Sequence, residues 1–257
     1  MNSKLKQSGF SLTEVLLAVG TLALGMALIA GVFPVAVHFT TQTIERTTAA
    51  VVADEAFAKI KLYKIDFTHT FWAGPPDPTL NCIAFGNVTQ YAALNTTAIT
   101  EYLYPSLNTN TNQQYSWSAI CRLVNLPTRS VQVTVFVCRK IGRAAIYIDP
   151  MNFLNPPIAY PMPVPVAVSQ NAPDELSINN LNIKTFINDG YTIVDNETGR
   201  IYRVLERYKL ATNDNIIQLD RPWVPGINIP PSVWVIPPPV NGGRGPCIGV
   251  FQKVISF

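Results

Sequence analysis

The most pronounced pattern in the chain is a long apolar run near its amino terminus. No Asp, Glu, Lys or Arg occurs from Val15 to Ile44, and from Val15 to Val37 the only hydroxyl belongs to Thr21. At about 1.5 Å per residue, a helix from Val15 to Val37 is roughly 35 Å long, which is enough to cross a hydrocarbon core about 30 Å thick. The pattern predicts a transmembrane helix over residues 12–37.

Beyond this run, the apolar positions take the spacing of an amphipathic helix. They recur first every seven residues and then every three or four: Val37, Ile44, Val51, Ala53, Ala56, Phe57 and Ile60. We therefore expect one helix over residues 10–64, kinked at Pro34, where a backbone hydrogen bond is lost. Lys4 and Lys6 precede the run, so the amino end is expected to stay cytoplasmic and the rest to be exported.

Period-two alternation predicts a β-hairpin in the middle of the chain. Residues 115–124 and 130–139 both alternate, and the connection between them contains Pro127. One face of the hairpin should carry Trp117, Ala119, Cys121, Leu123, Val131, Val133, Val135 and Val137. Laid over the helix stripe, this hairpin predicts a β-rich head over residues 65–148.

The remaining sequence predicts a connector followed by a second β unit. Residues 149–173 are rich in proline and indicate a semi-rigid connector or a strap over the head. Five short strands expected within residues 174–257 indicate a small barrel or an extension of the sheet. The predicted fold class is α+β: a long amino-terminal helix packed on an antiparallel sheet, with an additional small all-β unit at the carboxy terminus.

Composition narrows the class of protein. Of the 257 residues 14% are charged, against about 25% in an average soluble protein, and the mean hydropathy is +0.18. The 21 prolines disfavour a compact, mostly helical protein. The formal net charge of +3 is too small for a dedicated nucleic-acid binder, and the hydrophobicity is too high for intrinsic disorder.

The residues that precede the apolar run carry a specific motif. Residues 9–17 read Gly-Phe-Ser-Leu-Thr-Glu-Val-Leu-Leu and follow a short basic segment. This motif resembles the cleavage and methylation signature of the type IV pilin and type II secretion pseudopilin superfamily, and the resemblance covers roughly Met1 to Tyr63. It implies a leader peptide over residues 1–9, cleavage between Gly9 and Phe10 by a prepilin peptidase, N-methylation of Phe10, and a pilin-like head.

The resemblance also implies a role for Glu14. An ionised carboxylate inside an apolar helix costs at least ~2.5–3.5 kcal/mol, so it needs a partner. In the superfamily, this glutamate pairs with the terminal amine of a neighbouring subunit and sets the axial register of a filament. The alternative is that Glu14 lies at the level of the lipid headgroups.

The expected function is therefore structural. We predict a prepilin, of the minor pilin or pseudopilin kind, that is assembled into a type IV pilus or a type II secretion-like filament. It would first lie in the inner membrane as a single-pass protein and then in a periplasmic or cell-surface filament. Expected partners are the prepilin peptidase, other pilin or pseudopilin subunits, the inner-membrane assembly platform and membrane lipid.

Two other functions remain open at this point. One is a pilin-stalked binding module for DNA, a surface or a secreted substrate, and the other is a membrane-anchored exported protein that does not polymerise. A basic cluster at Arg139, Lys140 and Arg143 supports nucleic acid as a partner only weakly. Removal of residues 1–9 would also lower the formal net charge from +3 to +1, because two lysines leave with them.

The four cysteines, Cys82, Cys121, Cys138 and Cys247, all lie on the side expected to be exported, where disulfides can form. Alternation places Cys121 and Cys138 on opposite faces of the hairpin, which argues against a bridge between them. Each would pair with Cys82 or Cys247, or stay free and buried. The sequence is equally compatible with two disulfides and with none.

No catalytic residue, cofactor or metal is predicted. Neither His38 nor His69 has the setting of a catalytic base, so a nucleophilic triad has no support. Three loop carboxylates could meet around calcium, although a solvated turn is the simpler interpretation: Asp189, Asp195 and Glu197. Sequons begin at Asn87, Asn95 and Asn196, and such matches arise easily by chance in Asn- and Thr-rich sequence.

Overall fold

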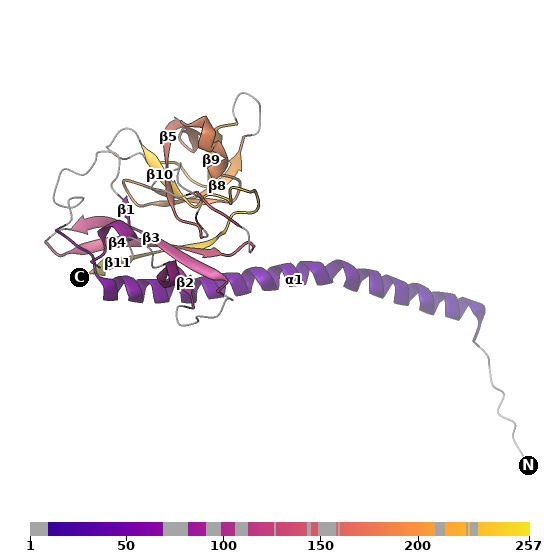
Figure 1. Ribbon diagram of the computed structural model, residues 1–257. Helices are drawn as coiled ribbons and strands as arrows, with labels where there is room; N and C mark the ends of the chain where they lie inside the picture. Colours follow the sequence, from indigo (N-terminus) through magenta and orange to yellow (C-terminus); the bar gives the residue numbers. More distant parts are fainter. Residues whose placement is uncertain are drawn as a thin grey trace, which may run out of the picture. The chain divides into compact units, whose positions relative to one another are not determined.

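The computed structural model describes most of the chain (Figure 1). The described residues are 10–68, 82–90, 99–105, 113–125, 127–142, 145–148, 158, 160–208, 214–224, 226 and 231–257. They form one long helix followed by antiparallel β-structure, so the protein has the α+β class that the sequence predicts. The chain divides into two compact units, Met1–Thr47 and Thr48–Phe257. The predicted leader over residues 1–9 lies outside the described residues.

Helix α1 spans Leu12–Tyr63 and continues through Pro34. From Thr48 onward its buried positions are three or four residues apart: Ala49, Val52, Ala53, Ala56, Phe57 and Ile60. The sequence therefore locates the carboxy-terminal half of this stripe correctly. It misplaces the start, because Ile44 is 57% and Val51 50% exposed. Residues advance about 100° each around a helix, so Val51 lies off the face that Ala49 and Val52 share.

The head is built on a five-stranded antiparallel sheet in the order β1-β3-β4-β11, with β2 also paired to β3. Its strands are β1 (Cys82–Ala84), β2 (Leu103–Tyr104), β3 (Tyr115–Asn125), β4 (Ser130–Arg139) and β11 (Cys247–Ser256). The predicted hairpin is confirmed as β3 and β4, which pair from Tyr115↔Arg139 to Asn125↔Ser130. Two short helices flank the sheet, α3 (Phe85–Val88) and the 3₁₀ helix η1 (Ile99–Tyr102).

The second β unit is a closed six-stranded antiparallel barrel in the order β10-β5-β6-β9-β8-β7. Its strands are β5 (Val164–Ala172), β6 (Glu175–Ile178), β7 (Thr192–Asp195), β8 (Ile201–Arg207), β9 (Ile216–Leu219) and β10 (Ser232–Val235). A 3₁₀ helix, η2 (Leu181–Phe186), lies in the β6–β7 connection. Closure removes the free edges of the sheet, as it does in other small barrels.

The boundaries of this unit differ from those expected. Residues 164–172, which the sequence assigns to a connector, form β5 of the barrel. Pro165 is tolerated because residues 164–167 pair with β10 alone, so its missing N–H is not needed by a second strand. At the other end, β11 pairs with β4 and belongs to the head sheet. The barrel is therefore inserted between two neighbouring strands of the head.

Three apolar cores hold unit Thr48–Phe257 together. One face of the sheet, carrying Trp117, Cys121 and Val133, packs with the buried stripe of α1. The opposite face, carrying Ile120, Phe136 and Cys138, packs against Val194, Trp234 and Ile236 of the barrel unit. The barrel interior forms the third core. Figure 1 shows the sheet between the end of α1 and the barrel strands. The predicted facing of Trp117, Ala119, Cys121 and Leu123 is confirmed.

A polar contact fixes the β7–β8 turn on the sheet. The Oδ1 atom of Asn196 accepts hydrogen bonds from the Cys82 N–H at 3.0 Å and from the indole N–H of Trp234 at 2.7 Å. Asn196 is only 4% exposed, so the sequon that begins there is inaccessible to a glycan. Gly199 closes the turn with φ +67°, and an added Cβ would lie 2.9 Å from Oε1 of Gln132. This turn is buried rather than solvated.

We expect Asn196→Ala to lower the unfolding free energy of the full chain by about 2–4 kcal/mol, because two buried N–H donors lose their acceptor. Asn171→Ala is the matched control. That side chain is exposed and bonds only Glu175 among the described contacts, so a change within about 0.5 kcal/mol is expected. Denaturant unfolding in detergent micelles measures both. Equal effects would contradict the bridging role of Asn196.

Candidate assembly and membrane-anchoring site

The first part of α1 exposes every large apolar side chain it carries. From Phe10 to Ile44, these side chains are 48% to 86% exposed. The helix is long and apolar enough to cross a membrane, with a mean hydropathy of 2.4 over its most apolar 18-residue window. An apolar surface that runs around a helix on all sides is costly to expose to water, since each buried CH₂ is worth about 0.8 kcal/mol. Such a surface is suited to lipid or to packing against other protein.

A capping box begins this helix. The backbone N–H of Ser11 donates to Oε2 of Glu14 at 3.0 Å, and the N–H of Glu14 faces the Ser11 hydroxyl at 3.3 Å. This reciprocal pattern satisfies two of the backbone donors that a helix start leaves without partners. The Ser-x-x-Glu spacing is the sequence signal for such a box, and it gives Glu14 a local capping role that was not among the predictions for this residue. Phe10 precedes the box and is 86% exposed, while Gly9 lies outside the described residues.

Hydroxyl groups after the apolar run are bonded within the helix. Thr40, Thr41, Thr43 and Thr47 each donate to the carbonyl four residues earlier, at 2.8 to 3.0 Å. Thr21, the one hydroxyl inside the run, donates to the carbonyl of Ala18 at 3.0 Å. Because these hydroxyls are already hydrogen-bonded within the helix, they add little polarity to its surface, which stays largely apolar as far as Ile44.

The other end of α1 is held by a network centred on Glu101 of η1. Lys59 donates to the backbone carbonyl of Glu101 at 2.9 Å and lies 3.6 Å from its carboxylate. Tyr63 donates to the same carboxylate at 2.6 Å, and the indole N–H of Trp117 donates to the Glu101 carbonyl at 3.1 Å. The ammonium of Lys59 also lies 6.0 Å from the centre of the Trp117 ring. The last turns of α1 are thus fixed in orientation as well as buried.

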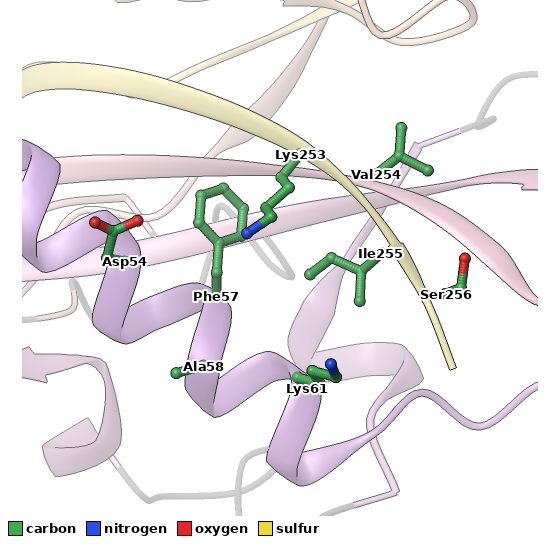
Figure 2. Close-up of a pocket in the computed structure, with 8 residues that line it drawn as sticks. All are labelled: Asp54, Phe57, Ala58, Lys61, Lys253, Val254, Ile255 and Ser256. Atoms are coloured by element: carbon green, nitrogen blue, oxygen red, sulfur yellow. The ribbon is translucent and has the colours of Figure 1, made fainter.

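A groove of about 430 Å³ runs between the last turns of α1 and the edge strand β11. Figure 2 shows its lining residues: Asp54, Phe57, Ala58, Lys61, Lys253, Val254, Ile255 and Ser256. Ile255 points from β11 towards the helix, and the ammonium of Lys253 lies 5.9 Å from the centre of the Phe57 ring. The polar side chains of the lining are Asp54, Lys61, Lys253 and Ser256, and the rest of the lining is apolar.

The structure does not gather the other candidate residues into a chemical site. Within the described part of the chain, no group of three or more His, Cys, Asp or Glu side chains could hold a metal ion. Asp195 instead accepts from Thr198, and burial raises the pKa of its carboxyl. His38 pairs with the Gln42 amide on α1, at 3.1 Å. His69 and Arg143 lie outside the described residues.

The four cysteines lie in the sheet of the head, and none is bonded to another in this structure. Cys82, Cys121 and Cys138 are buried, and Cys247 is half-buried. Burial raises the pKa of Cys82 to about 12 and raises that of Cys121 further. Such thiols stay protonated at neutral pH and are poor nucleophiles, which is unlike the low-pKa cysteines of enzymes.

No protein-family model, curated protein or solved structure matches this chain. The resemblance to pilins and pseudopilins therefore rests on the motif and the apolar run alone. The barrel inserted into the head has no counterpart among these comparisons that could assign it a ligand.

Lys59→Ala should lower the unfolding free energy by about 1–2 kcal/mol, because a hydrogen bond and two partly buried ion pairs at Glu55 and Glu101 are lost. Lys61→Ala, on the same helical turn but exposed, should change it by less than about 0.5 kcal/mol. Denaturant titration of both full-length variants in detergent tests this. A larger effect of Lys61→Ala would refute the anchoring role of Lys59.

Proposed function

We propose that this protein is a structural subunit, a prepilin of the minor pilin or pseudopilin kind, that assembles through α1 into a type IV pilus or a type II secretion-like filament. A prepilin peptidase cuts it after Gly9, and Phe10 becomes the N-methylated amino terminus. Before assembly the protein lies in the inner membrane, with its amino end cytoplasmic and the head exported. Its partners are other subunits and the assembly platform.

One observation carries this proposal: the exposed apolar surface of α1 has a single carboxylate, Glu14, close to its start. From Val15 to Ile44 no charged residue occurs, so a second ionic contact is not available over this stretch. Such a surface suits lipid in the monomer and neighbouring helices in a polymer. A buried ion pair at one position then sets register, because every shifted arrangement would leave a charge without its partner.

The capping box does not compete with this role. A carboxylate has about four acceptor sites, and the capping bonds from Ser11 to Oε2 leave acceptor capacity on the group. Cleavage would create a new terminal amine on Phe10, which is about one helical turn from Glu14 of its own chain. The capping bonds place Oε2 of Glu14 beside Ser11 at the start of the helix, and this position supports a contact with an amine of a neighbouring subunit.

The inserted barrel favours a second candidate function, a binding module displayed on a pilin stalk. The barrel has its own apolar core, and that core does not include α1. A unit that is not needed to cover the helix is free to serve recognition. This function requires the same processing and anchoring as the first, so the two differ in what the head contacts.

The membrane span can be tested by placing two charges at its centre. Leu24→Lys with Leu28→Lys, one helical turn apart, should move the full chain from the carbonate-resistant membrane fraction to the soluble or degraded fraction, since each lysine costs about 2.5–3.5 kcal/mol there. Thr43→Lys with Thr47→Lys has the same spacing beyond the span and should leave the chain in the membrane. Retention of the Leu24 and Leu28 variant would contradict the span.

The role of Glu14 can be separated from capping by two conservative changes. Glutamine is accepted at this position of a capping box but carries no charge. Glu14→Gln should therefore leave a normal helix and a normal mature amino terminus, yet abolish recovery of the protein in sheared filaments. Ser11→Ala removes the cap, costs about 1 kcal/mol, and should still assemble.

Mass spectrometry of the amino terminus is the internal control for these variants. The parent chain and both variants should begin at methylated Phe10, whereas Gly9→Val should retain residues 1–9. Normal assembly of Glu14→Gln would overturn the register role. An intact Met1 in the parent chain would overturn the proposed function as a whole and favour a membrane-anchored protein that does not polymerise.

A further inference from the structure

The four cysteines occupy two faces of the head sheet. Cys121 belongs to the core shared with α1. Cys82, Cys138 and Cys247 belong to the core between the sheet and the barrel. Because successive residues of a strand point to opposite faces, a thiol on one face cannot reach a thiol on the other without moving the backbone.

Cys138 and Cys247 lie directly opposite each other on β4 and β11. Next to them, the N–H of Arg139 donates to the carbonyl of Pro246 at 2.9 Å, so this neighbouring pair is the hydrogen-bonded one. Hydrogen-bonded and non-hydrogen-bonded pairs alternate along an antiparallel ladder, which makes Cys138 and Cys247 a non-hydrogen-bonded pair. The Cα atoms of such pairs are about 4.5 Å apart, within the range that a disulfide spans.

A β-bulge in β11 creates this opposition. Cys247 pairs with Cys138 while Gly249 pairs with Val137, so Ile248 is the extra residue between them. Without the bulge, Cys247 would share the face of Gly249 and Phe251 and would point towards α1. With it, the Cys247 side chain lies on the face of Cys138, and its thiol donates to the carbonyl of Gly249 at 3.6 Å. Burial, and after it the neighbouring Cys247 side chain, raises the pKa of Cys138.

Cys82 cannot serve as a partner for either of these thiols. It pairs with Arg122 of β3, and Arg122 pairs with Gln132 of β4. Gln132 and Cys138 are six residues apart on the same strand, which corresponds to roughly 20 Å. Cys121 pairs with Ile83, the residue that follows Cys82 on β1. The side chains of Cys121 and Cys82 therefore lie on opposite faces of the sheet.

We propose that Cys138 and Cys247 form the one disulfide of the described head, and that Cys82 and Cys121 remain thiols. The bridge lies at the base of the inserted barrel, where the chain leaves β4 and returns to β11. The segment it closes contains every strand of the barrel. It links the strand before the insertion to the strand after it, so β11 stays beside β4 even if the barrel unfolds. This proposal rests on the proposed export of the head.

The oxidant is an exported dithiol oxidase in its disulfide form. Cys247 is the half-buried thiol, so its thiolate attacks one sulfur of the oxidase disulfide after losing its proton to solvent. The second oxidase sulfur leaves as a thiolate. Cys138 then attacks the Cys247 sulfur, and its proton passes to the remaining oxidase sulfur, which this attack expels. The two cysteines lose two electrons in total, and the oxidase disulfide gains them.

Thiol mapping of the full chain tests the pairing. The protein is extracted from membranes in a denaturing detergent with an alkylating reagent and no reductant, digested, and analysed by mass spectrometry. We expect one cross-linked peptide pair joining Cys138 to Cys247, with alkyl groups on Cys82 and Cys121. Alkylation of all four cysteines, or a bridge that involves Cys82 or Cys121, would overturn the proposal.

A second arm separates a failure of pairing from a failure of export. Reduced full chain is incubated in detergent with oxidised glutathione. Closure of the Cys138–Cys247 bridge there, together with four free thiols in the cell extract, would support the geometry and refute the exported location. No closure with glutathione would refute the pairing itself, whatever the fate of the proposed filament function.

Serine variants provide matched controls. Cys247→Ser should abolish the cross-linked peptide, whereas Cys82→Ser and Cys121→Ser should retain it. Reductant should lower the melting temperature of the parent chain by roughly 5–15 °C, because a bridge closing so long a loop restricts the unfolded state. It should leave the melting temperature of Cys247→Ser unchanged. A reductant effect equal in both chains would overturn the structural role of the bridge.

Discussion

The burial of both faces of the head sheet is the constraint on which the rest of the structure depends. Strand β4 is the centre of this arrangement, with Val133 and Val135 on the face of α1 and Phe136 and Cys138 on the face of the barrel. An antiparallel sheet commonly leaves one face in water. Here the second face is apolar, so the chain needs a second layer, and the inserted barrel supplies it. The buried contacts of Asn196 then fix that layer in place.

The helix divides its length between two kinds of surface. Up to Ile44 its large apolar side chains are exposed, and from Ala49 a narrow buried stripe takes over. This stripe consists largely of alanine and valine, whose small side chains allow the sheet to approach closely. At Gly249 of β11 an added Cβ would lie 3.4 Å from the Cβ of Ala49. Packing on the head therefore uses other residues of the helix than the exposed apolar surface does.

Period and composition predict α1, the β3–β4 hairpin and the facing of Trp117 and Cys121, because each depends on residues close in sequence. The closed barrel and the return of β11 to the head depend on pairings between distant strands, which local patterns do not encode. Pro165 hides β5, since a proline normally argues against a strand. The position of Cys247 depends on a one-residue bulge, and a bulge inverts the facing that simple alternation predicts. The Ser11–Glu14 cap is also local, and its Ser-x-x-Glu spacing is the pattern that indicates it.

The inserted topology gives the barrel a core that is separate from the core shared with α1. A change inside the barrel core, for example at Val166 or Ile217, alters a cluster that contains no residue of α1. Such a change can affect the buried stripe of α1 only through the head sheet, and backbone hydrogen bonds between its strands hold that sheet together. The barrel interior and the helix stripe can therefore vary independently, provided that Phe136 and Trp234 keep the core between sheet and barrel. If the chain is the filament subunit that we propose, this separation explains physically how it could carry a large additional unit without altering the surface of its helix.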